Sequence, residues 1–402
     1  MRLRINKGKA SGKMPAPPSK SMAHRYLICS GLAEGESVIS GIDKSEDVLA
    51  TIDCLRAIGA RVEFRGDDVV VNGAFPVTTS PDKKLYCRES GSTQRFFVPI
   101  CLTSGSPSII EGKQSLFKRP LGVYEKICLE QGITFTQGDE SLYLDGKLKS
   151  GEYKVKGNIS SQFISGLLFA LPLLKGDSTI SIIPPIESRP YINLTVSALE
   201  KFGVNVKWLD DKTIFIKGSQ KYKACSCAVE GDYSNSAFFA ALNSLGSDIE
   251  ISGLDENSLQ GDKVYKKYLQ NLSNGTPTIH LGDCPDLGPV LMAVAAAKSG
   301  AIFNDTRRLK IKESDRGEAM AEELRKFGAD VTVYDNSIVV FPKEFHAPIE
   351  VINGHNDHRV VMSLSVLLTL TGGEIEGAEA VSKSLPDFFE RLKKLGIEVE
   401  EV

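Results

Sequence analysis

Six segments of the sequence place polar and charged residues directly before an apolar stretch long enough to form a helix. They are residues 19–25 (SKSMAHR), 89–95 (ESGSTQR), 160–163 (SSQF), 231–234 (GDYS), 285–289 (PDLGP) and 357–360 (DHRV). Every segment contains Ser, Gly or Asp, which are favoured where a helix begins. The first turn of a helix presents free N–H groups and about half a positive charge, so it attracts anions. Capping alone would explain any one of these segments.

Cations inside three of these helix starts favour anion binding over simple capping. Lys20, Arg25, Arg95 and Arg359 fall within the first turns, where a positive side chain opposes the helix dipole. A bound anion would offset that cost. Arg119 stands before a Pro-Leu-Gly turn, where a guanidinium is suited to bidentate binding of phosphate or carboxylate. The sequence therefore predicts an anionic ligand.

A charged cluster at residues 310–316 (KIKESDR) combines three cations with two carboxylates. Such a run is usually a solvated surface, and that explanation would suffice for this segment alone. In a site that attracts anions, however, carboxylates weaken binding. Asp286 and Glu313 are therefore expected to serve proton transfer instead.

These segments recur within a repeat of about seventy residues. A glycine, a short stretch and then β-branched residues occur with the first glycine at positions 35, 105, 176, 246, 300 and 373, at intervals of 70, 71, 70, 54 and 73. A second pattern is a helix end, a glycine and alternating apolar and polar residues. It occurs at 55–64, 199–208, 324–333 and 392–401, with looser copies at 128–135 and 269–279. The glycine is expected to end the helix, and the alternating run to form a strand with one buried face.

Each repeat thus predicts an α/β unit of helix, strand, helix, strand and further strand. One such unit is too small to bury a core, but three copies could share one. A chain of 402 residues is also longer than a single hydrophobic core usually supports. We expect two domains of three units each.

The composition fits an ordinary globular enzyme and disfavours several other classes of protein. The chain is 42% hydrophobic and 25% charged, with a net charge of −3 and no basic block, so nucleic-acid and membrane-surface binding have little support. The eight cysteines lack the spacing of a zinc site, and we expect plain thiols. No signal peptide is evident, and the longest uncharged stretch, 157–174, is too polar to span a bilayer. A cytoplasmic protein is expected.

Taken together, these segments resemble the 5-enolpyruvylshikimate-3-phosphate synthases, also called 3-phosphoshikimate 1-carboxyvinyltransferases. The matching segments are 19–25, 90–95, 119–122, 160–163, 188–191, 229–232, 285–286, 312–316, 356–359 and 383–387. They follow the order of the family and cover nearly the whole chain. Each is weak alone, but ten in order are specific.

The resemblance implies an α/β fold of two domains, each with three copies of a small βαβαββ-type unit arranged around a pseudo-threefold, and a cleft between the domains. The domains would be 13–230 and 1–12 with 231–402. The implied reaction transfers the enolpyruvyl group of phosphoenolpyruvate to the 5-hydroxyl of shikimate 3-phosphate. It releases phosphate by addition and elimination through a tetrahedral intermediate, on the route to chorismate and the aromatic amino acids. The resemblance implies no metal or organic cofactor, and a monomer with small-molecule substrates only.

The resemblance also assigns residues to the two substrates. The implied ligands of shikimate 3-phosphate are Lys20, Ser21, Arg25, Ser160, Ser161, Gln162, Ser188, Tyr191, Asp286 and Lys312. Those of phosphoenolpyruvate are Lys20, Gly91, Arg119, Gln162, Arg316, Arg359 and Lys383. Asp286 is the implied base for the hydroxyl and Glu313 the implied acid, with Lys20 assisting. Cations beside Glu313 favour its carboxylate form, so a lysine remains the alternative proton donor.

The sequence departs from the family pattern at three positions, and it also bears on three rival functions. Glu89, Phe96 and Arg308 depart from the commonest residues, which affects the expected affinity and glyphosate response rather than the activity. The sister transferase acting on UDP-N-acetylglucosamine usually has a reactive cysteine in the loop before Arg119, and none occurs here. A non-catalytic phospholigand-binding protein would not need Asp286 and Glu313. An RNA-binding protein would be expected to show a basic face.

Overall fold

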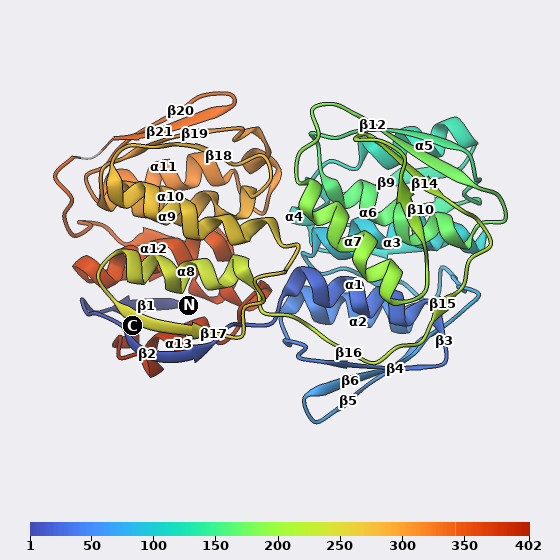
Figure 1. The fold of residues 1–402 in the computed structure, drawn as a ribbon, viewed down its shortest axis with the longest axis horizontal. Helices are drawn as coiled ribbons and strands as arrows, with labels where there is room; N and C mark the ends of the chain where they lie inside the picture. The colour runs from blue at the N-terminus through green and yellow to red at the C-terminus, as the bar shows by residue number, and fades with distance from the viewer. Residues whose placement is uncertain (342) are drawn as a thin grey trace. The chain divides into compact units, whose positions relative to one another are not determined.

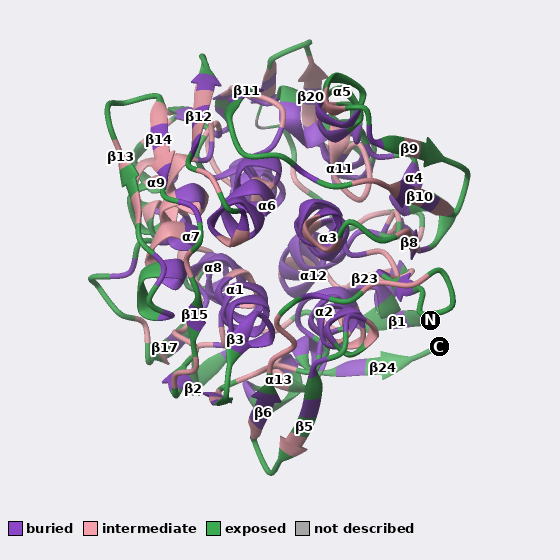
Figure 2. Cartoon of the chain, turned by 90° about the vertical axis from the view of Figure 1, so that its right-hand side faces the viewer, coloured by how far each residue is buried: buried purple, intermediate pink, exposed green. Residues whose placement is uncertain are grey.

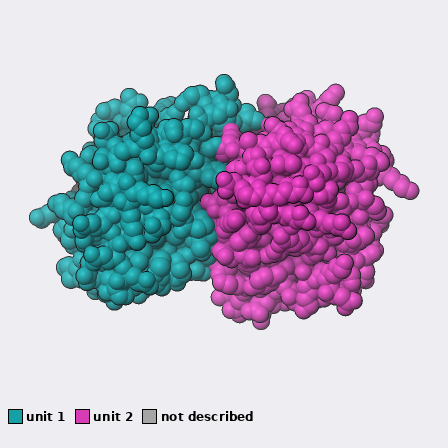
Figure 3. Space-filling model, turned by 90° about the horizontal axis from the view of Figure 1, so that it is seen from below, with its two compact units in different colours: residues 1–19, 231–402 teal, residues 20–230 magenta. Residues whose placement is uncertain are grey.

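The computed structural model describes residues 1–341 and 343–402, which divide into two compact units. Unit 1 contains Met1–Ser19 and Gly231–Val402, and unit 2 contains Lys20–Glu230 (Figure 3). The sequence placed residues 13–19 with the second of these, but they belong to unit 1. The reason is that β2 (Ser11–Pro15) pairs in parallel with β17 (Asp248–Ser252).

Unit 2 consists of three copies of one α/β motif (Figure 1). The first contains α1 (Lys20–Gly31), β4 (Glu36–Ser40), α2 (Glu46–Ala57), β5 (Arg61–Arg65) and β6 (Asp68–Asn72). The second contains β7 (Leu85–Tyr86), α3 (Gly91–Ser104), β8 (Ser108–Glu111), α4 (Gln114–Phe117), α5 (Gly122–Gln131), β9 (Thr134–Gln137) and β10 (Ser141–Asp145). The third contains β11 (Glu152–Lys156), α6 (Ser161–Ala170), η1 (Leu171–Leu173), β12 (Ser178–Ile183), α7 (Arg189–Lys201), β13 (Val206–Trp208) and β14 (Thr213–Ile216). The short strands β3 (Ala33–Glu34), β15 (Tyr222–Lys223) and β16 (Cys227–Ala228) complete the unit.

The three four-stranded sheets of unit 2 share one strand order. They run β16-β4-β6-β5, β7-β8-β10-β9 and β11-β12-β14-β13. In each sheet the first two strands are parallel and the last two form an antiparallel hairpin. A buried helix follows the first strand of the second and third sheets, so α3 and α6 begin at the carboxyl ends of β7 and β11. The repeated topology therefore places the helix starts at equivalent positions.

Unit 1 repeats this motif in its fifth and sixth copies. The fifth contains β18 (Thr278–His280), η3 (Pro285–Leu287), α10 (Gly288–Ala297), β19 (Ala301–Asn304), η4 (Arg307–Ile311), α11 (Arg316–Lys326), β20 (Asp330–Val333) and β21 (Ser337–Phe341). The sixth contains β22 (Ile352–Asn353), α12 (His358–Thr371), β23 (Gly373–Glu376), η5 (Ala378–Lys383), α13 (Phe388–Lys394) and β24 (Val399–Glu401). The N-terminal strand β1 (Arg2–Ile5) completes the sixth sheet, in the order β22-β23-β1-β24. Both ends of the chain are thus fixed in one sheet.

In five copies a glycine follows the helix that leads into the hairpin, as the sequence pattern predicts. Gly59, Gly132, Gly203, Gly328 and Gly396 have φ values of 105°, 71°, 78°, 86° and 93°. This left-handed region is strained for other residues but not for glycine, which lets the chain turn from the helix into the hairpin.

Each unit has its own hydrophobic core, built around three helices that are buried along most of their length. In unit 2 these are α1, α3 and α6, which Figure 2 shows nearly end-on with strands outside them. In unit 1 they are α8 (Tyr233–Ser244), α10 and α12. All eight cysteines are free thiols, and only Cys225 is not fully buried. Within the described residues, no helix is both long and apolar enough to cross a membrane.

The fourth copy lacks the hairpin that the other copies have. It contains α8, β17, η2 (Gly261–Val264) and α9 (Tyr265–Asn274), and its sheet has only the strands β17 and β2. The helix end and strand predicted at 269–279 are present, because α9 ends at Asn274 before Gly275 and β18 (Thr278–His280) follows, but β18 pairs with β19 and opens the fifth copy. The 54-residue interval between glycines 246 and 300 leaves too few residues for a hairpin.

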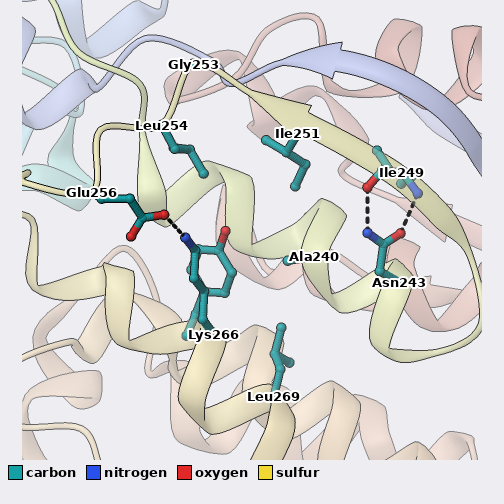
Figure 4. A pocket seen from close by; sticks show the side chains of 10 residues that line it. Ala240, Asn243, Ile249, Ile251, Gly253, Leu254, Glu256, Lys266 and Leu269 are labelled. Atoms are coloured by element: carbon teal, nitrogen blue, oxygen red, sulfur yellow. Dashed lines mark hydrogen bonds and ion pairs between the residues drawn. The ribbon is translucent and has the colours of Figure 1, made fainter.

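Asn243, in the last turn of α8, takes the place of the missing strand beside β17. Its amide nitrogen donates to the carbonyl of Ile249 at 2.7 Å, and its amide oxygen accepts from the Ile249 N–H at 2.8 Å (Figure 4). The open edge is bordered by a pocket of about 400 Å³ lined by Ile251, Leu254 and Leu269, among others. One side chain therefore satisfies the backbone groups of Ile249 that a neighbouring strand would otherwise pair.

Asn243→Ala is expected to lower the free energy of unfolding by about 1–2 kcal/mol, because two backbone groups lose their partner. Urea unfolding followed by circular dichroism measures this change. Asn257→Ala, at an exposed asparagine just beyond β17, is the control and should change stability by less than about 0.5 kcal/mol. Equal stability of the two variants would contradict the role given to Asn243.

Candidate active site

Arg316, the first residue of α11, is the centre of a buried ionic network in unit 1. Only 1% of its side chain is exposed. Its Nε donates to Asp357 Oδ2 at 2.8 Å, Nη1 to Asp286 Oδ1 at 2.8 Å and Nη2 to Glu313 Oε2 at 2.6 Å. Burial alone would lower the pKa of Arg316, but Asp357, Glu313 and Asp286 outweigh it and raise the pKa overall. The guanidinium is permanently charged and holds three carboxylates in place.

Asp286, in η3 just before α10, is surrounded by cations. Lys312 Nζ lies 3.0 Å from its Oδ1, and Arg359 Nη2 lies 3.7 Å from its Oδ2. Burial would raise the pKa of Asp286, but Lys312, Arg359 and Arg316 hold it well below its usual range. Burial in turn lowers the pKa of Lys312, against the opposing effect of Asp286. Asp286 is therefore an ionised carboxylate at neutral pH.

Asp357 also belongs to this network, although its position before a helix predicted only a capping role. It is fully buried and caps α12 by accepting the Arg359 N–H at 2.9 Å. It also accepts a hydrogen bond from Ser314 at 3.1 Å, besides those from Arg316. A single buried carboxylate thus contacts two of the three arginines predicted to bind phosphoenolpyruvate, through the guanidinium of Arg316 and the backbone N–H of Arg359.

Lys383, at the end of η5, lies against the loop that leads into α12. Its Nζ donates to the carbonyl and side-chain oxygens of Asn356 at 2.6 and 2.9 Å. Asn356 has a φ of 51°, in the left-handed region that asparagine tolerates better than most residues. The structure therefore brings the predicted unit 1 residues to neighbouring helix starts: Asp286, Lys312, Glu313, Arg316, Arg359 and Lys383.

In unit 2, Arg25 joins α1 to α7. Its three guanidinium nitrogens donate to Thr195 Oγ1 at 2.9 Å, to the Ser21 carbonyl at 2.6 Å and to the Tyr191 carbonyl at 2.9 Å. Burial lowers the pKa of Arg25 to about 10, so it remains charged at neutral pH. Ser188 precedes α7 with a φ of 56°, which brings Ser188 and Tyr191 to the same helix start. Thr195 is a partner that the sequence did not reveal.

Lys20, at the start of α1, is held by Asp47 in the first turn of α2. The two charged groups are 2.7 Å apart and both side chains are mostly buried. Thr93 of α3 donates to the backbone carbonyl of Asp47 at 3.4 Å, which links this pair to the next helix start. Asp47 was not predicted, since an acidic residue in a first helical turn is common.

Gln162, near the start of α6, connects that helix to the start of α3. Its Oε1 accepts from Arg95 Nη1 at 2.7 Å, and its Nε2 donates to Ser92 at 2.8 Å. Ser160 caps α6 by accepting the Gln162 N–H at 3.3 Å, and Ser161 is buried beside it. Three of the predicted ligands therefore lie at one helix start, supported by Arg95.

Gly91, the first residue of α3, allows two arginines to approach the backbone. A Cβ atom at this position would lie 3.1 Å from Arg95 Nη1 and closer still to Arg119 Nη1, inside van der Waals contact. Arg119 is itself 9% exposed, so its guanidinium is held close to the start of α3. Gly91 and Arg119, which the resemblance assigns to phosphoenolpyruvate, are thus direct neighbours.

One group of described side chains has ligand atoms close enough to hold a metal ion. The ligand atoms of Glu322, Glu323 and His355 lie within 4.8 Å of one another. Glu323 already accepts hydrogen bonds from Lys326 and His355, and its hydrogen bond raises the pKa of His355. Glu323, His355 and Lys326 therefore form an ionic cluster, and no residue of the candidate site belongs to it.

Comparison with known proteins identifies the family. The model of EPSP synthase (3-phosphoshikimate 1-carboxyvinyltransferase) matches residues 5–392. The chain belongs to the EPSP synthase family. A 3-phosphoshikimate 1-carboxyvinyltransferase of Clostridium perfringens is 43% identical, covering 98% of this chain and 97% of that protein. The protein of the same name from Clostridioides difficile is 40% identical, covering 99% and 98%.

Solved structures of other EPSP synthases and enolpyruvyl transferases have the same fold. EPSP synthase from Acinetobacter baumannii is 24% identical and superposes with a TM-score of 0.80 over 100% of both chains. The enolpyruvyl transferase NikO from Streptomyces tendae is 15% identical, with a TM-score of 0.81 over 100% of this chain and 98% of that one. The fold class and the family predicted from the sequence are confirmed.

Proposed function

We propose that this EPSP synthase family member transfers the enolpyruvyl group of phosphoenolpyruvate to the 5-hydroxyl of shikimate 3-phosphate and releases phosphate. As a 3-phosphoshikimate 1-carboxyvinyltransferase it is an enzyme of the shikimate pathway and of aromatic amino acid biosynthesis. The observation that best supports specific residue roles is the unit 1 network, where Asp286 and Glu313 both accept hydrogen bonds from the buried Arg316. Acid–base chemistry needs such carboxylates, whereas anion binding alone would not.

The proposed roles follow from where the charges lie. The unit 2 helix starts offer Lys20, Arg25 and Arg119 to the anionic groups of the substrates, together with the hydroxyls of Ser160, Ser161 and Ser188. Asp286 would accept the proton of the attacking 5-hydroxyl. Glu313 would deliver a proton to the methylene carbon as the new C–O bond forms, with Lys20 as the alternative donor. Loss of a proton from the resulting methyl group and departure of phosphate then restore the enolpyruvyl double bond.

Substrate charge explains how a strongly ionised Asp286 can act as a base. Lys312, Arg359 and Arg316 lower the pKa of Asp286, which makes it a weak base. Phosphate and carboxylate groups of the substrates would share these cations and cancel part of their field. The pKa of Asp286 would then rise toward a value suited to proton transfer. We propose that bound substrate thereby activates its own base.

Phosphoenolpyruvate binding gives a direct test of the Arg119 assignment. Arg119→Ala is expected to raise the KM for phosphoenolpyruvate by about tenfold or more, because a charge-assisted pair at a mostly buried site is lost. The KM for shikimate 3-phosphate should change by less than about threefold. Lys118→Ala, at the exposed neighbouring cation, is the matched control. Wild-type kinetics for Arg119→Ala would refute the assignment.

The proposed reaction is tested by phosphate release from the purified protein. Release is expected only when phosphoenolpyruvate and shikimate 3-phosphate are both present. Release with UDP-N-acetylglucosamine in place of shikimate 3-phosphate would instead indicate the sister transferase. Binding of both ligands without release would indicate a phospholigand-binding protein.

We further propose that the protein is a monomer located in the cytoplasm. Sedimentation at equilibrium would test the monomer, and cell fractionation would test the location.

A further inference from the structure

Unit 2 contains a pocket at the end of α3 that is opposite to the predicted substrate residues. It has a volume of about 610 Å³ and is formed by residues 75–77 after β6, 103–104 of α3, 147–150 between β10 and β11, and 173–175 after α6. Gly91 begins α3 and Ser104 ends it, so about 20 Å of helix separates the two regions. All three copies of unit 2 contribute to this pocket, and no proposed step of the reaction uses it.

The lining of this pocket combines apolar side chains with lysines. Val77, Leu148 and Leu174 are buried, and Phe75 and Leu173 are half-buried. The charged lining residues are Lys147, Lys149 and Lys175, all exposed, and no carboxylate lines the pocket. A cavity of this size and mixed character is typical of sites for small organic molecules.

The three lysines have no acidic partner within the part of the chain that the structure describes. Lys149 Nζ donates only to the backbone carbonyl of Gln131, at 3.3 Å. Other exposed lysines of unit 2 do form ion pairs, such as Lys154 with Glu152 and Lys221 with Glu34. A protein with a net charge of −3 thus keeps a local excess of positive charge beside an apolar wall.

The helix dipoles explain only part of this charge. α3 and α6 both end near the pocket. The Lys147 side chain lies against Gly105, the C-cap residue directly after α3. A helix C-terminus carries about half a negative charge, so two ends balance about one of the three cations. About two positive charges remain without a counterion.

We propose that this pocket binds a small organic anion with a flat apolar body, of the aromatic carboxylate class. The anionic group lies among Lys147, Lys149 and Lys175, where exposed ammonium groups can reorient to meet it. The apolar body covers Val77, Leu148 and Leu174. Ser150, which is exposed and also lines the pocket, adds a hydroxyl to this polar side.

Isothermal calorimetry with 2-naphthoate tests this site on the full chain. One saturable site with a dissociation constant below about 1 mM is expected. The double variant Lys147→Glu with Lys175→Glu should weaken binding by at least about tenfold, because attraction becomes repulsion. The charge-matched control is Lys154→Glu with Lys221→Glu, which alters exposed lysines outside the pocket and should stay within about twofold.

Two further measurements complete the test. The neutral analogue 2-naphthamide should bind at least about fivefold more weakly than 2-naphthoate. Saturating shikimate 3-phosphate and phosphoenolpyruvate should leave 2-naphthoate binding unchanged, and displacement would show that the probe occupies the substrate site.

If the double variant fails to fold by circular dichroism, Lys147→Gln and Lys175→Gln replace it. Absence of saturable binding, or equal loss in the control, would overturn the proposal. Phosphate release is assayed separately, so failure of this site leaves the proposed reaction intact.

Discussion

Glu313→Gln is expected to lower turnover by about 10²–10⁴, which is the usual contribution of one general acid or base. The substitution keeps the side-chain volume and an oxygen that can accept from Arg316 Nη2, but it removes the titratable proton. Asp286→Asn is expected to lose turnover to a similar extent. It also removes the negative charge that faces the cations Lys312 and Arg316, so it is expected to change shikimate 3-phosphate binding as well. Steady-state phosphate release and calorimetry separate the two effects.

The control for both variants is Glu318→Gln, which changes an exposed carboxylate in the first turn of the same helix, α11. It should keep turnover within about twofold of wild type. Shikimate 3-phosphate affinity should stay within about threefold for Glu313→Gln. Near-normal turnover in both Glu313→Gln and Asp286→Asn would show that the acid–base assignment is wrong, although the family and fold would stand.

Arg316→Met should lower the free energy of unfolding by about 3–5 kcal/mol, because three carboxylates lose their shared buried counterion. Urea unfolding measured on the purified protein gives this value. The control is Arg307→Met, which removes an arginine that is 58% exposed and paired with Asp335 at 2.6 Å. An exposed ion pair contributes about 0–1 kcal/mol, so the control should be nearly neutral.

A double variant shows whether the loss arises from uncompensated charge. Adding Asp357→Asn to Arg316→Met removes one of the orphaned carboxylates and should recover part of the lost stability. If Arg316→Met were no less stable than Arg307→Met, the network would not stabilise unit 1 as described. Activity should be lost in both Arg316 variants, since Arg316 is also proposed to meet phosphoenolpyruvate.

Much of the fold was predictable because its signals are local. A glycine after each helix, and an alternating run after the glycine, encode the helix end and the hairpin strand within about ten residues. The fourth copy shows the limit of this approach. Residues 269–279 encode a helix end and a strand, but the local pattern does not show that this strand, β18, belongs to the fifth copy. The role of Asn243 depends on a contact with β17 that no local pattern encodes.

The candidate site was predictable in its charges but not in the partners that position them. Cations at helix starts conflict with the helix dipole, and that conflict is visible in the sequence. Their partners are distant in the chain: Asp357 lies 41 residues from Arg316, Asp47 lies 27 from Lys20, and Thr195 lies 170 from Arg25. Since such partners are also common capping or core residues, only the folded structure reveals them.

In the proposed reaction, this protein adds the 5-hydroxyl of shikimate 3-phosphate to phosphoenolpyruvate and then eliminates phosphate. The most direct test is to run the reaction in deuterium oxide and examine the product by mass spectrometry and proton NMR. Addition converts the methylene carbon to a methyl group that takes a deuteron from the solvent-exchanged acid, and elimination returns a vinyl group. The expected product is an enolpyruvyl ether of shikimate 3-phosphate with deuterium at its methylene carbon, formed only when both substrates are present. Absence of this product, or a product without deuterium, would show that the protein does not catalyse this addition and elimination.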